Sequence, residues 1–360
     1  MTQRTPLTLE DLGWNDFFAA AFEPHAKQGL VPARVIRESR GVHGVTTGDT
    51  ELSAASSGRL WHGEEGGGPP AVGDWVAVRL PTLPEEPGLI RAILPRKSKF
   101  SRKAAGARTD EQVVAANVDT AFLMTGLDHD FSPRRIERYL TAAWESGVDP
   151  VLLLNKADLD AELEAHVHEV ETIAMGLPVH AISAKRGEGI EALAPYLGRG
   201  KTISVLGSSG VGKSTLINRL LGSETQRIGA VRQSDDRGRH TTTHRELFML
   251  PGGGLILDTP GMRELQLWEA DEGFGAAFAD IEELAAGCRF GNCHHTGEPG
   301  CSVEAAVASG ELAPERLESW RKLQREMELT RARQDELIRL REKQRVKAIH
   351  KAQRNFRPRR

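Results

Sequence analysis

The spacing of apolar residues changes along the chain and predicts more than one kind of domain. Near the start, TLEDLGWNDFFAAAF places Thr8 and Asp11 as a capping box before a run with helical spacing, which predicts a short amphipathic helix. From about 35 to 95, short β-prone runs alternate with glycine and proline clusters: ARVIRES, ELSAASSGRLW, GDWVAVRL and GLIRAILP. Four or five short strands predict a small β-barrel, with an oligonucleotide-binding fold as the leading candidate.

From Val113 onward, strand-like runs alternate with helical segments. VVAANVDTAFLMT comes first, and SPRRIERYLTAAWESG follows with Ser132 as its expected N-cap and Pro133 as its first helical residue. Further strands are expected at 150–155, 178–183, 201–206, 246–250 and 254–258. This alternation predicts a mostly parallel sheet that helices cover on both faces.

Helical patterns return beyond residue 275, around a group of three cysteines. Residues 315–351 have the pattern of one long charged helix. A partial apolar stripe at its start should pack on the cysteine segment, and the stripe consists of Leu317, Trp320, Leu323 and Met327.

Length and charge narrow the class of protein. A chain of 360 residues should hold two or three domains. The first twenty residues carry acidic groups and no basic region followed by an apolar stretch, and no run approaches about 18 apolar residues, so we expect a soluble, cytoplasmic protein without a membrane partner. The net charge is −3, but residues 339–360 hold ten Lys or Arg against one Glu, so the remainder sums to −12. Such a tail indicates a polyanion partner, most often nucleic acid, and a solvated end is the alternative.

A glycine-rich loop after a short strand carries the strongest chemical signal. KTISVLGSSGVGKST contains G-x-x-x-x-G-K-S, a pattern in which main-chain N–H groups and a helix N-terminus converge on phosphate oxygens. Lys213 should reach the β and γ phosphates, where it assists catalysis, and Ser214 should hold Mg²⁺. The residues expected to bind the nucleotide here are Gly207, Ser208, Ser209, Gly210, Val211, Gly212, Lys213, Ser214 and Thr215.

Two later segments should complete the phosphate end of the site. LILDTPG places Asp258 at the end of a buried strand, where it can hold the magnesium shell, and Gly261 can offer its N–H to the γ-phosphate. The intervening GAVRQSDDRGRHTTTHRE is polar and lacks periodicity, which fits either a segment ordered by ligand or a solvated loop. One of Thr241, Thr242 and Thr243 should complete the magnesium shell, and we select Thr242.

Residues suited to reading a base come earlier in the chain. VLLLNKADL leads into Asn155, Lys156 and Asp158, and AISAK follows one strand later with Ser183, Ala184 and Lys185. The Asp158 carboxylate can accept hydrogen bonds from the N1–H and the exocyclic amine of guanine, whereas adenine has no matching pair of donors. Guanine is therefore the expected base, because leaving such a carboxylate unpaired discriminates strongly.

The order of these segments is the usual order of a GTPase rotated along the chain. Both base segments precede the phosphate loop, and the two switch-like segments follow it. Domain termini commonly lie near each other, so a circular permutation can join the old ends and keep every contact in the site. The new end falls just after DTPGMREL, which leads directly into the C-terminal domain.

The cysteine segment has the spacing of a metal site. CRFGNCHHTGEPGC contains C-x4-C-x-H-x5-C, which can form a Cys3His tetrahedron around one Zn²⁺. Because no ligand position remains open, the spacing indicates a structural site, and unmetallated core thiols are the alternative. The candidate ligands are Cys288, Cys293, Cys301 and one of His294 and His295.

Together the motifs resemble the ribosome small-subunit-dependent GTPases of the RsgA/YjeQ family. The resemblance is carried by the β-rich front, AANVD, NKAD, SAK, GSSGVGKST, GRHTTT, DTPG and the cysteine cluster, so it covers nearly the whole chain. It implies a multidomain α/β protein with an oligonucleotide-binding barrel, a circularly permuted GTPase domain and a helical zinc domain in which His295 is the ligand. The corresponding ranges are 1–34 for an N-terminal helical extension, 35–100 for the barrel, 101–272 for the GTPase domain and 273–360 for the zinc domain with its tail.

The resemblance also implies a function and its partners. It implies GTP hydrolysis in late maturation of the small (30S) ribosomal subunit, stimulated by the subunit and accompanied by release of the factor. The expected partners are the subunit with its rRNA and GTP or GDP, and we expect a monomer. The alternatives are an RNA-binding scaffold that uses GTP only as a conformational latch, and a P-loop ATPase or small-molecule kinase. The last leaves Asp158 and the basic tail unexplained.

A catalytic residue is missing from its usual place. Met262 follows DTPG, where many GTPases have a glutamine that orients the attacking water, and a thioether cannot do this. His240 in GRHTTT is the nearest replacement, and the resemblance supports a histidine from this segment. A structural or RNA-facing role for His240 is the alternative. We therefore expect slow intrinsic turnover, with His240, Lys213 and Thr242 as the catalytic residues.

Overall fold

Two structural units make up the chain in the computed structural model, one of residues 1–102 with 112–266 and the other of residues 103–111 with 267–360. The structure describes residues 7–39, 42–57, 60, 68–83, 86–103, 111–128, 131–174, 176–222, 226–227, 245–258 and 271–328. Within these ranges no helix has the combined length and apolar character that a bilayer span requires.

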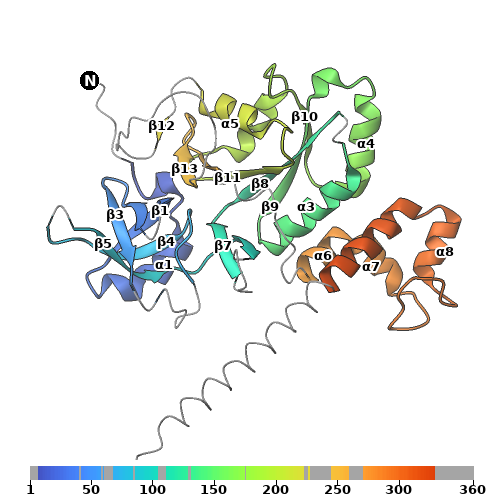
Figure 1. The fold of residues 1–360 in the computed structure, drawn as a ribbon, viewed down its shortest axis with the longest axis horizontal. Helices are drawn as coiled ribbons and strands as arrows, with labels where there is room; N and C mark the ends of the chain where they lie inside the picture. The colour runs from blue at the N-terminus through green and yellow to red at the C-terminus, as the bar shows by residue number, and fades with distance from the viewer. Residues whose placement is uncertain are drawn as a thin grey trace, which may run out of the picture. The chain divides into compact units, whose positions relative to one another are not determined.

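The first unit begins with a closed five-stranded barrel, as the short β-prone runs predict (Figure 1). Its strands pair in the order β1-β2-β3-β5-β4, and β4 returns to β1. They are β1 (Val31–Ser39), β2 (Val42–Thr46), β3 (Glu51–Ser56), β4 (Trp75–Arg79) and β5 (Gly88–Ile93). Strand β2 was absent from the four predicted runs, because Gly44 interrupts its five residues.

An N-terminal helix covers part of the barrel. Thr8 and Asp11 do exchange hydrogen bonds as a capping box, but the turn that they cap is the 3-10 segment η1 (Glu10–Leu12). The amphipathic helix α1 (Asp16–Ala26) starts afterwards, where the Asn15 side chain accepts from the N–H of Phe17. The rings of Trp14 and Phe18 lie 4.7 and 5.8 Å from that of Trp75, so the barrel is the partner surface of this helix.

The same unit contains a second domain built on the predicted, mostly parallel sheet. Its strand order is β10-β9-β8-β11-β14-β13, and only β13 runs antiparallel to its neighbour within this series. The strands are β8 (Thr120–Gly126), β9 (Asp149–Asn155), β10 (Val179–Ile182), β11 (Thr202–Gly207), β13 (Glu246–Met249) and β14 (Leu255–Asp258), and the short β12 (Gln226–Arg227) pairs with β13.

The helices of this domain follow the predicted alternation with two differences. The segments are α3 (Pro133–Glu145), η2 (Ala157–Leu159), α4 (Leu163–Ala174), η3 (Ile190–Tyr196) and α5 (Lys213–Leu221). Ser132 takes the N-cap position of α3, but its side chain makes no cap hydrogen bond. The connection between β10 and β11 is the 3-10 segment η3 and contains Pro195, which has no N–H for a helical hydrogen bond.

The predicted run 113–125 spans two strands. Strand β7 (Glu111–Ala116) pairs with β6 (Lys99–Lys103) in a separate two-stranded sheet, and β8 begins only at Thr120. Between them Asn117 has a φ of 54°, a left-handed conformation that asparagine tolerates better than most residues. The side chain of Asn117 also donates to the carbonyl of Gly73 at 3.1 Å, which ties this break to the barrel.

The barrel and the parallel sheet share hydrogen bonds at one edge. Strand β1 pairs antiparallel with β13, with Arg37 opposite Glu246 (Figure 1). Next to this pair, Arg245 and Glu38 form an ion pair with a 2.7 Å separation. The strands of the two domains therefore form one continuous hydrogen-bonded sheet.

Arg34 of β1 lies at the centre of this junction and is only 1% exposed. Its guanidinium donates to the carbonyl oxygens of Leu12, Gly73 and Asn117 and to Oγ1 of Thr202, the last at 2.9 Å. Burial lowers the pKa of Arg34 to about 10, and the charges of two nearby carboxylates oppose this effect. One charged side chain thus joins η1, the barrel and the start of β11.

The second unit is helical and contains the cysteine segment. Its helices are α6 (Asp271–Ala277), α7 (Ala279–Ala285) and α8 (Ser302–Ser309), and residues 314–328 form a further helix. The predicted apolar stripe is confirmed as buried: Leu317, Trp320, Leu323 and Met327. The predicted helix 315–351 is helical as far as 328, and the rest lies outside the described residues.

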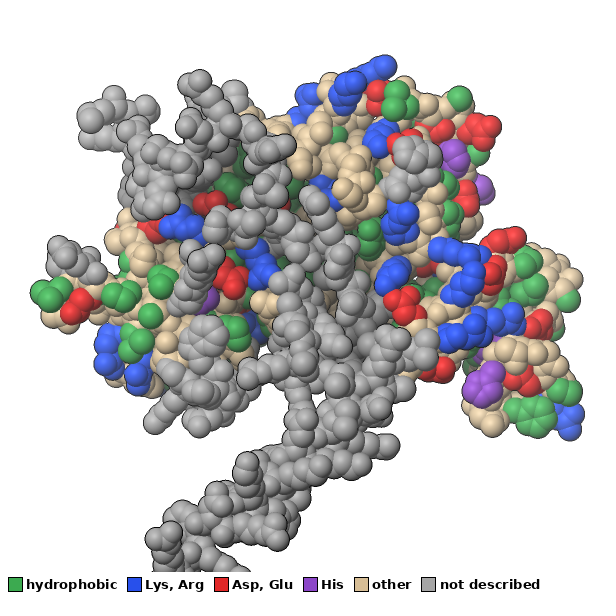
Figure 2. All heavy atoms as spheres, in the orientation of Figure 1, with side chains coloured by type: hydrophobic (Ala, Val, Ile, Leu, Met, Phe, Trp, Pro, Cys, Tyr) green, Lys and Arg blue, Asp and Glu red, His purple; other side chains and the backbone are tan. Residues whose placement is uncertain are grey.

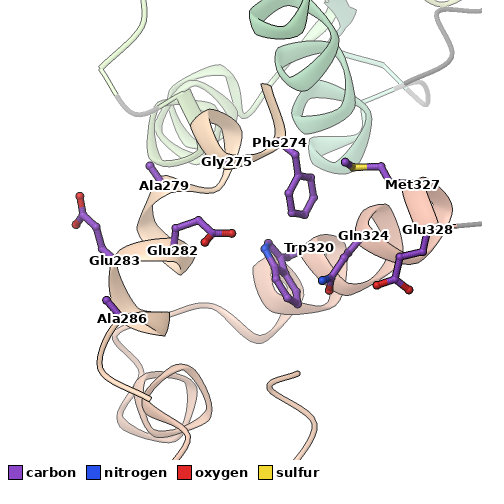
Figure 3. A pocket seen from close by; sticks show the side chains of 10 residues that line it. All are labelled: Phe274, Gly275, Ala279, Glu282, Glu283, Ala286, Trp320, Gln324, Met327 and Glu328. Atoms are coloured by element: carbon purple, nitrogen blue, oxygen red, sulfur yellow. The ribbon is translucent and has the colours of Figure 1, made fainter. Parts of the chain in front are cut away.

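A groove of about 720 Å³ runs between α6, α7 and the helix at 314–328 (Figure 3). Phe274, Trp320 and Met327 form its apolar part, and the Glu282 side chain points toward Trp320. Gly275, Ala279 and Ala286 also line the groove.

We predict that Arg34→Met lowers the free energy of unfolding of the first unit by about 3 kcal/mol, because three carbonyls and a hydroxyl lose a charged donor in a buried place. Urea denaturation of the full chain measures this change. Arg91→Met is the matched control, since Arg91 is exposed on β5 and its loss should cost less than about 0.5 kcal/mol. Equal effects of the two substitutions would contradict the role given to Arg34.

Candidate guanine-nucleotide site and metal centre

The glycine-rich loop has the expected strand-loop-helix context. Strand β11 ends at Gly207, and α5 begins at Lys213 with Gly212 as its N-cap. Gly212 has a φ of 109°, and a Cβ placed there would lie 2.3 Å from Nδ2 of Asn155. Only glycine therefore allows the loop to approach the Asn155 side chain this closely.

Lys213 and Ser214 occupy the start of α5. The Lys213 ammonium donates to the carbonyl of Gly207 at 2.7 Å and to that of Ser208, so it lies over the loop rather than out in solvent. Phosphate oxygens are stronger acceptors for an ammonium than these carbonyls, because they carry charge. Ser214, the expected magnesium ligand, is exposed at the first turn of the helix.

Asn155 connects three segments that are far apart in the sequence. Its Nδ2 donates to the carbonyl of Val211 in the phosphate loop at 2.8 Å. Its Oδ1 accepts from the N–H of Ala184 at 2.9 Å. The side chain is 3% exposed, so both bonds are shielded from water. The residues predicted from NKAD, SAK and the glycine-rich loop therefore lie together.

The residues after Asn155 bring Asp158 to the same edge of the sheet. Lys156 has a φ of 67°, and this left-handed conformation turns the chain into η2, which contains Asp158. The Lys156 ammonium forms an ion pair with Asp128, which follows β8. Non-glycine residues in this conformation cluster at functional sites. Asp128 was absent from the sequence prediction, although it follows an apolar strand at the same edge.

The Asp158 carboxylate has two partners from the loop after β10. Ser183 is hydrogen-bonded to it and is the main reason why the pKa of Asp158 is lowered. Arg186 lies 3.2 Å from Oδ2 of Asp158, and the Asp158 side chain is only 7% exposed. A carboxylate with a lowered pKa stays ionised at neutral pH, which is the form that accepts hydrogen bonds from a base. Lys185 is exposed beside it.

Asp258 is the last residue of β14, the parallel neighbour of β11. Because carboxyl ends of parallel strands meet at one edge of a sheet, Asp258 lies at the same edge as the phosphate loop. The other predicted residues of the phosphate end, Thr242, His240 and Gly261, lie outside the described residues.

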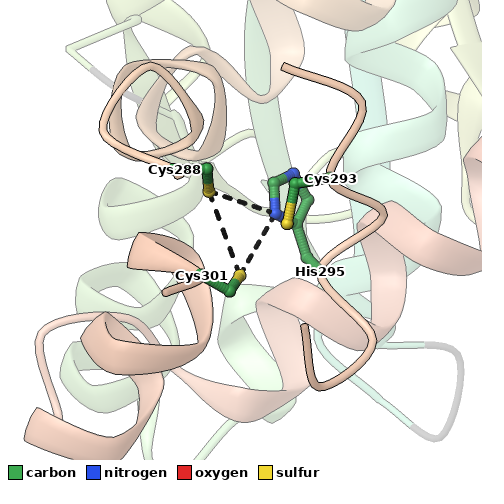
Figure 4. A group of neighbouring side chains, drawn as sticks. All are labelled: Cys288, Cys293, His295 and Cys301. Carbon is green, nitrogen blue, oxygen red and sulfur yellow. Dashed lines mark hydrogen bonds between the residues drawn. The ribbon is translucent and has the colours of Figure 1, made fainter. Parts of the chain in front are cut away.

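Three thiols and one imidazole converge in the second unit (Figure 4). The four candidate ligand atoms lie within 4.8 Å of one another and belong to Cys288, Cys293, His295 and Cys301. Nδ1 of His295 is 3.7 Å from Sγ of Cys288 and 3.4 Å from Sγ of Cys301. A tetrahedral zinc with Zn–S bonds of about 2.3 Å separates its ligands by roughly 3.8 Å, so the spacing fits zinc.

The surroundings select His295 over His294 and fix the ligand loop. His295 is 4% exposed and its ring packs 5.2 Å from that of Trp320, whereas His294 is exposed. The N–H groups of Thr296 and His294 donate to Glu298, which lowers the pKa of that carboxyl to about 2 and orders the ligand loop. The N–H of Glu304, in the first turn of α8, donates to Sγ of Cys301 at 3.4 Å and fixes the position of this sulfur.

Comparison with known proteins agrees with this geometry. The model of the family described as "RsgA GTPase" matches residues 93–268. A protein of Opitutus terrae, "Small ribosomal subunit biogenesis GTPase RsgA", is 49% identical over 97% of this chain and 97% of its own length. The chain belongs to the RsgA GTPase family. It is therefore an enzyme that hydrolyses GTP.

Other members of the RsgA family and two solved structures extend the match. A protein of the same name from Syntrophotalea carbinolica is 45% identical over 89% of this chain and 90% of its own. The crystal structure of YjeQ from Thermotoga maritima has a TM-score of 0.61 and 29% identity over 82% of this chain and 97% of that one. The structure of YloQ, "a circularly permuted GTPase", has a TM-score of 0.60 and 24% identity, and the match covers 84% of this chain and 96% of that one. The predicted circular permutation is confirmed.

We predict that His295→Ala strongly weakens metal binding by this RsgA family member, because one of the four protein ligands of a closed tetrahedral site is lost. Elemental analysis of purified protein should find about one zinc in the unsubstituted chain and far less in the variant, with a lower melting temperature for the second unit. His294→Ala is the matched control and should keep its metal. Metal loss from His294→Ala with retention in His295→Ala would contradict this ligand assignment.

Proposed function

We propose that this GTPase acts in late maturation of the small ribosomal subunit, and that the subunit stimulates its hydrolysis of GTP. The observation that carries the nucleotide site is the pair of hydrogen bonds in which Asn155 donates to the carbonyl of Val211 and accepts from the N–H of Ala184. The observation that suggests the setting is the name of the relatives, each a "small ribosomal subunit biogenesis GTPase".

In this proposal the base and the phosphates are held by different segments. Asp158 accepts from the guanine N1–H and amine, while Asn155, Lys156 and the segment Ser183 to Lys185 enclose the base. The residues Gly207 to Thr215 hold the phosphates, with Lys213 on the β and γ groups. Gly261 offers its N–H to the γ-phosphate.

The proposed metals have separate roles. Mg²⁺ enters with GTP and is held by Ser214, Thr242 and Asp258, where it neutralises charge that develops on the phosphates. One Zn²⁺ is held by Cys288, Cys293, His295 and Cys301 and stabilises the fold of the second unit.

The proposed RNA contacts rest on fold and charge. The five-stranded barrel is of a type that binds oligonucleotides. On the face drawn in Figure 2, the Lys and Arg side chains of the described residues lie among Asp and Glu side chains rather than in one patch. The strongest concentration of positive charge in the sequence is in residues 339–360, so we propose that the tail, the barrel and the zinc module share the binding of rRNA.

The decisive measurement is multiple-turnover GTP hydrolysis with and without small ribosomal subunits. We expect slow intrinsic turnover and a large increase when subunits are added. We expect His240→Ala to cut the stimulated rate at least tenfold while GTP affinity stays within about twofold, since this side chain would orient water rather than bind nucleotide. If small subunits did not raise the rate of GTP hydrolysis, the result would favour the scaffold that uses GTP as a latch. If His240→Ala left the stimulated rate unchanged, His240 would have no part in the mechanism.

The base assignment has its own test. We predict that Asp158→Asn lowers GTP affinity by about a hundredfold or more and gives a preference for xanthosine triphosphate. An amide offers one acceptor and one donor, which match the N1–H and the C2 carbonyl of xanthine. Competition against a fluorescent GDP analogue measures both affinities. Unchanged selectivity would place the base elsewhere.

A further inference from the structure

The loop that follows β10 is attached to α5 by one arginine. Nε of Arg219 donates to the carbonyl of Ala184 at 2.8 Å. Another guanidinium nitrogen of Arg219 donates to the carbonyl of Lys185 at 2.7 Å. These are charge-assisted bonds in a planar fork, which fixes both the distance and the orientation of the two peptide groups.

The loop is shaped to admit this guanidinium. Gly187 has a φ of 86°, and a Cβ there would lie 2.4 Å from one terminal nitrogen of Arg219 and 2.9 Å from its Cζ. The turn closes on itself through the N–H of Gly187, which donates to the carbonyl of Ser183 at 2.6 Å. Any side chain at Gly187 would therefore displace the Arg219 group before it moved the turn.

Arg219 is rigidly related to the phosphate loop because it lies in the last turn of α5, the helix whose first turn follows that loop directly. The helix begins at Lys213, and Leu216 and Ile217 anchor it in the core of the domain. Arg219 lies on the same helix, two residues beyond Ile217. Its position is thus set by the element that also sets the phosphate-binding groups.

Both backbone polar groups of Ala184, its N–H and its carbonyl, are therefore held by side chains. Its N–H donates to Asn155 from the interior, and the carbonyl of the same residue accepts from Arg219 on the exterior. Ser183 immediately before it contacts the Asp158 carboxylate. Sequence motifs point to Asn155 but give no signal for Arg219, which follows the glycine-rich loop at an ordinary helical position.

We propose that Arg219 is a positioning residue for guanine recognition: it fixes the loop 183–187, and through Ser183 the Asp158 carboxylate, at a set distance from the phosphate loop. This inference rests on the guanine-binding role proposed for Asp158. In this proposal Arg219 acts through the loop 183–187 and not through a contact of its own with the base or the phosphates.

The test separates base binding from phosphate binding in the full-length protein. Arg219→Ala should weaken binding of a fluorescent GDP analogue and raise the KM for GTP about tenfold, with kcat within about twofold. Inorganic tripolyphosphate, which has no base, should compete against the analogue in both proteins with affinities within about twofold. Arg219→Lys should recover part of the loss, because an ammonium can donate to one of the two carbonyls. Asn218→Ala, on the same helix, is the matched control and should leave all values unchanged.

The outcomes distinguish this inference from the function on which it rests. An unchanged GDP affinity in Arg219→Ala, or equal losses for GDP and tripolyphosphate, would overturn the positioning role even if Asp158→Asn switches to xanthine. Failure of that switch would instead overturn the base assignment.

A double-mutant cycle gives a second measure. Gly187→Ala should weaken GDP binding in the unsubstituted chain by pushing the guanidinium away, and should add much less in an Arg219→Ala background. The backbone strain of alanine at positive φ is present in both backgrounds and cancels in the cycle. Additive losses would contradict the proposed contact.

Discussion

The nucleotide site depends on one buried amide that satisfies two backbone groups from different parts of the chain. The side-chain amide of Asn155 donates to the carbonyl of Val211 and accepts from the N–H of Ala184, and these partners are 56 and 29 residues away in the sequence. The end of a parallel strand can place a side chain at this point, since neighbouring strands reach the same edge in register, Ile182 beside Asn155. The site depends on which strands are neighbours in the sheet and not on their order along the chain, so that order can change without loss of the site. Circular permutation preserves the site for this reason.

Local patterns in the sequence predicted much of the fold and several of the segments that the structure brings together at the candidate site. The parallel strands, the glycine-rich loop, NKAD, SAK and the Cys3His spacing are each contained in a few consecutive residues, and their chemistry depends on residue type and spacing. The structure places Asn155, Ser183, Val211 and the residues near them together, and it prefers His295 to His294 through burial beside Trp320.

What the sequence did not predict consists of contacts between distant segments. Arg34 reaches Thr202 across 168 residues, and Arg219 reaches Ala184 across 35, with no local pattern that distinguishes either arginine from an exposed one. Strand β2 and the 3-10 segment η3 were missed for a related reason, because a glycine and a proline weaken their local pattern while tertiary pairing and packing hold them. Asp128 gains significance only once Lys156 is seen beside it.

The pairing of β1 with β13 makes the barrel a protective cover for the sheet of the GTPase domain. If the barrel were removed, β13 would lose β1, and among the described residues only the two-residue β12, which pairs with Phe248 and Met249, would remain on that side. Uncovered edge strands recruit strands from other molecules. A truncation that keeps the catalytic domain alone would therefore tend to aggregate. The smallest fragment that stays monomeric in solution should retain the residues from the N-terminal helix onward.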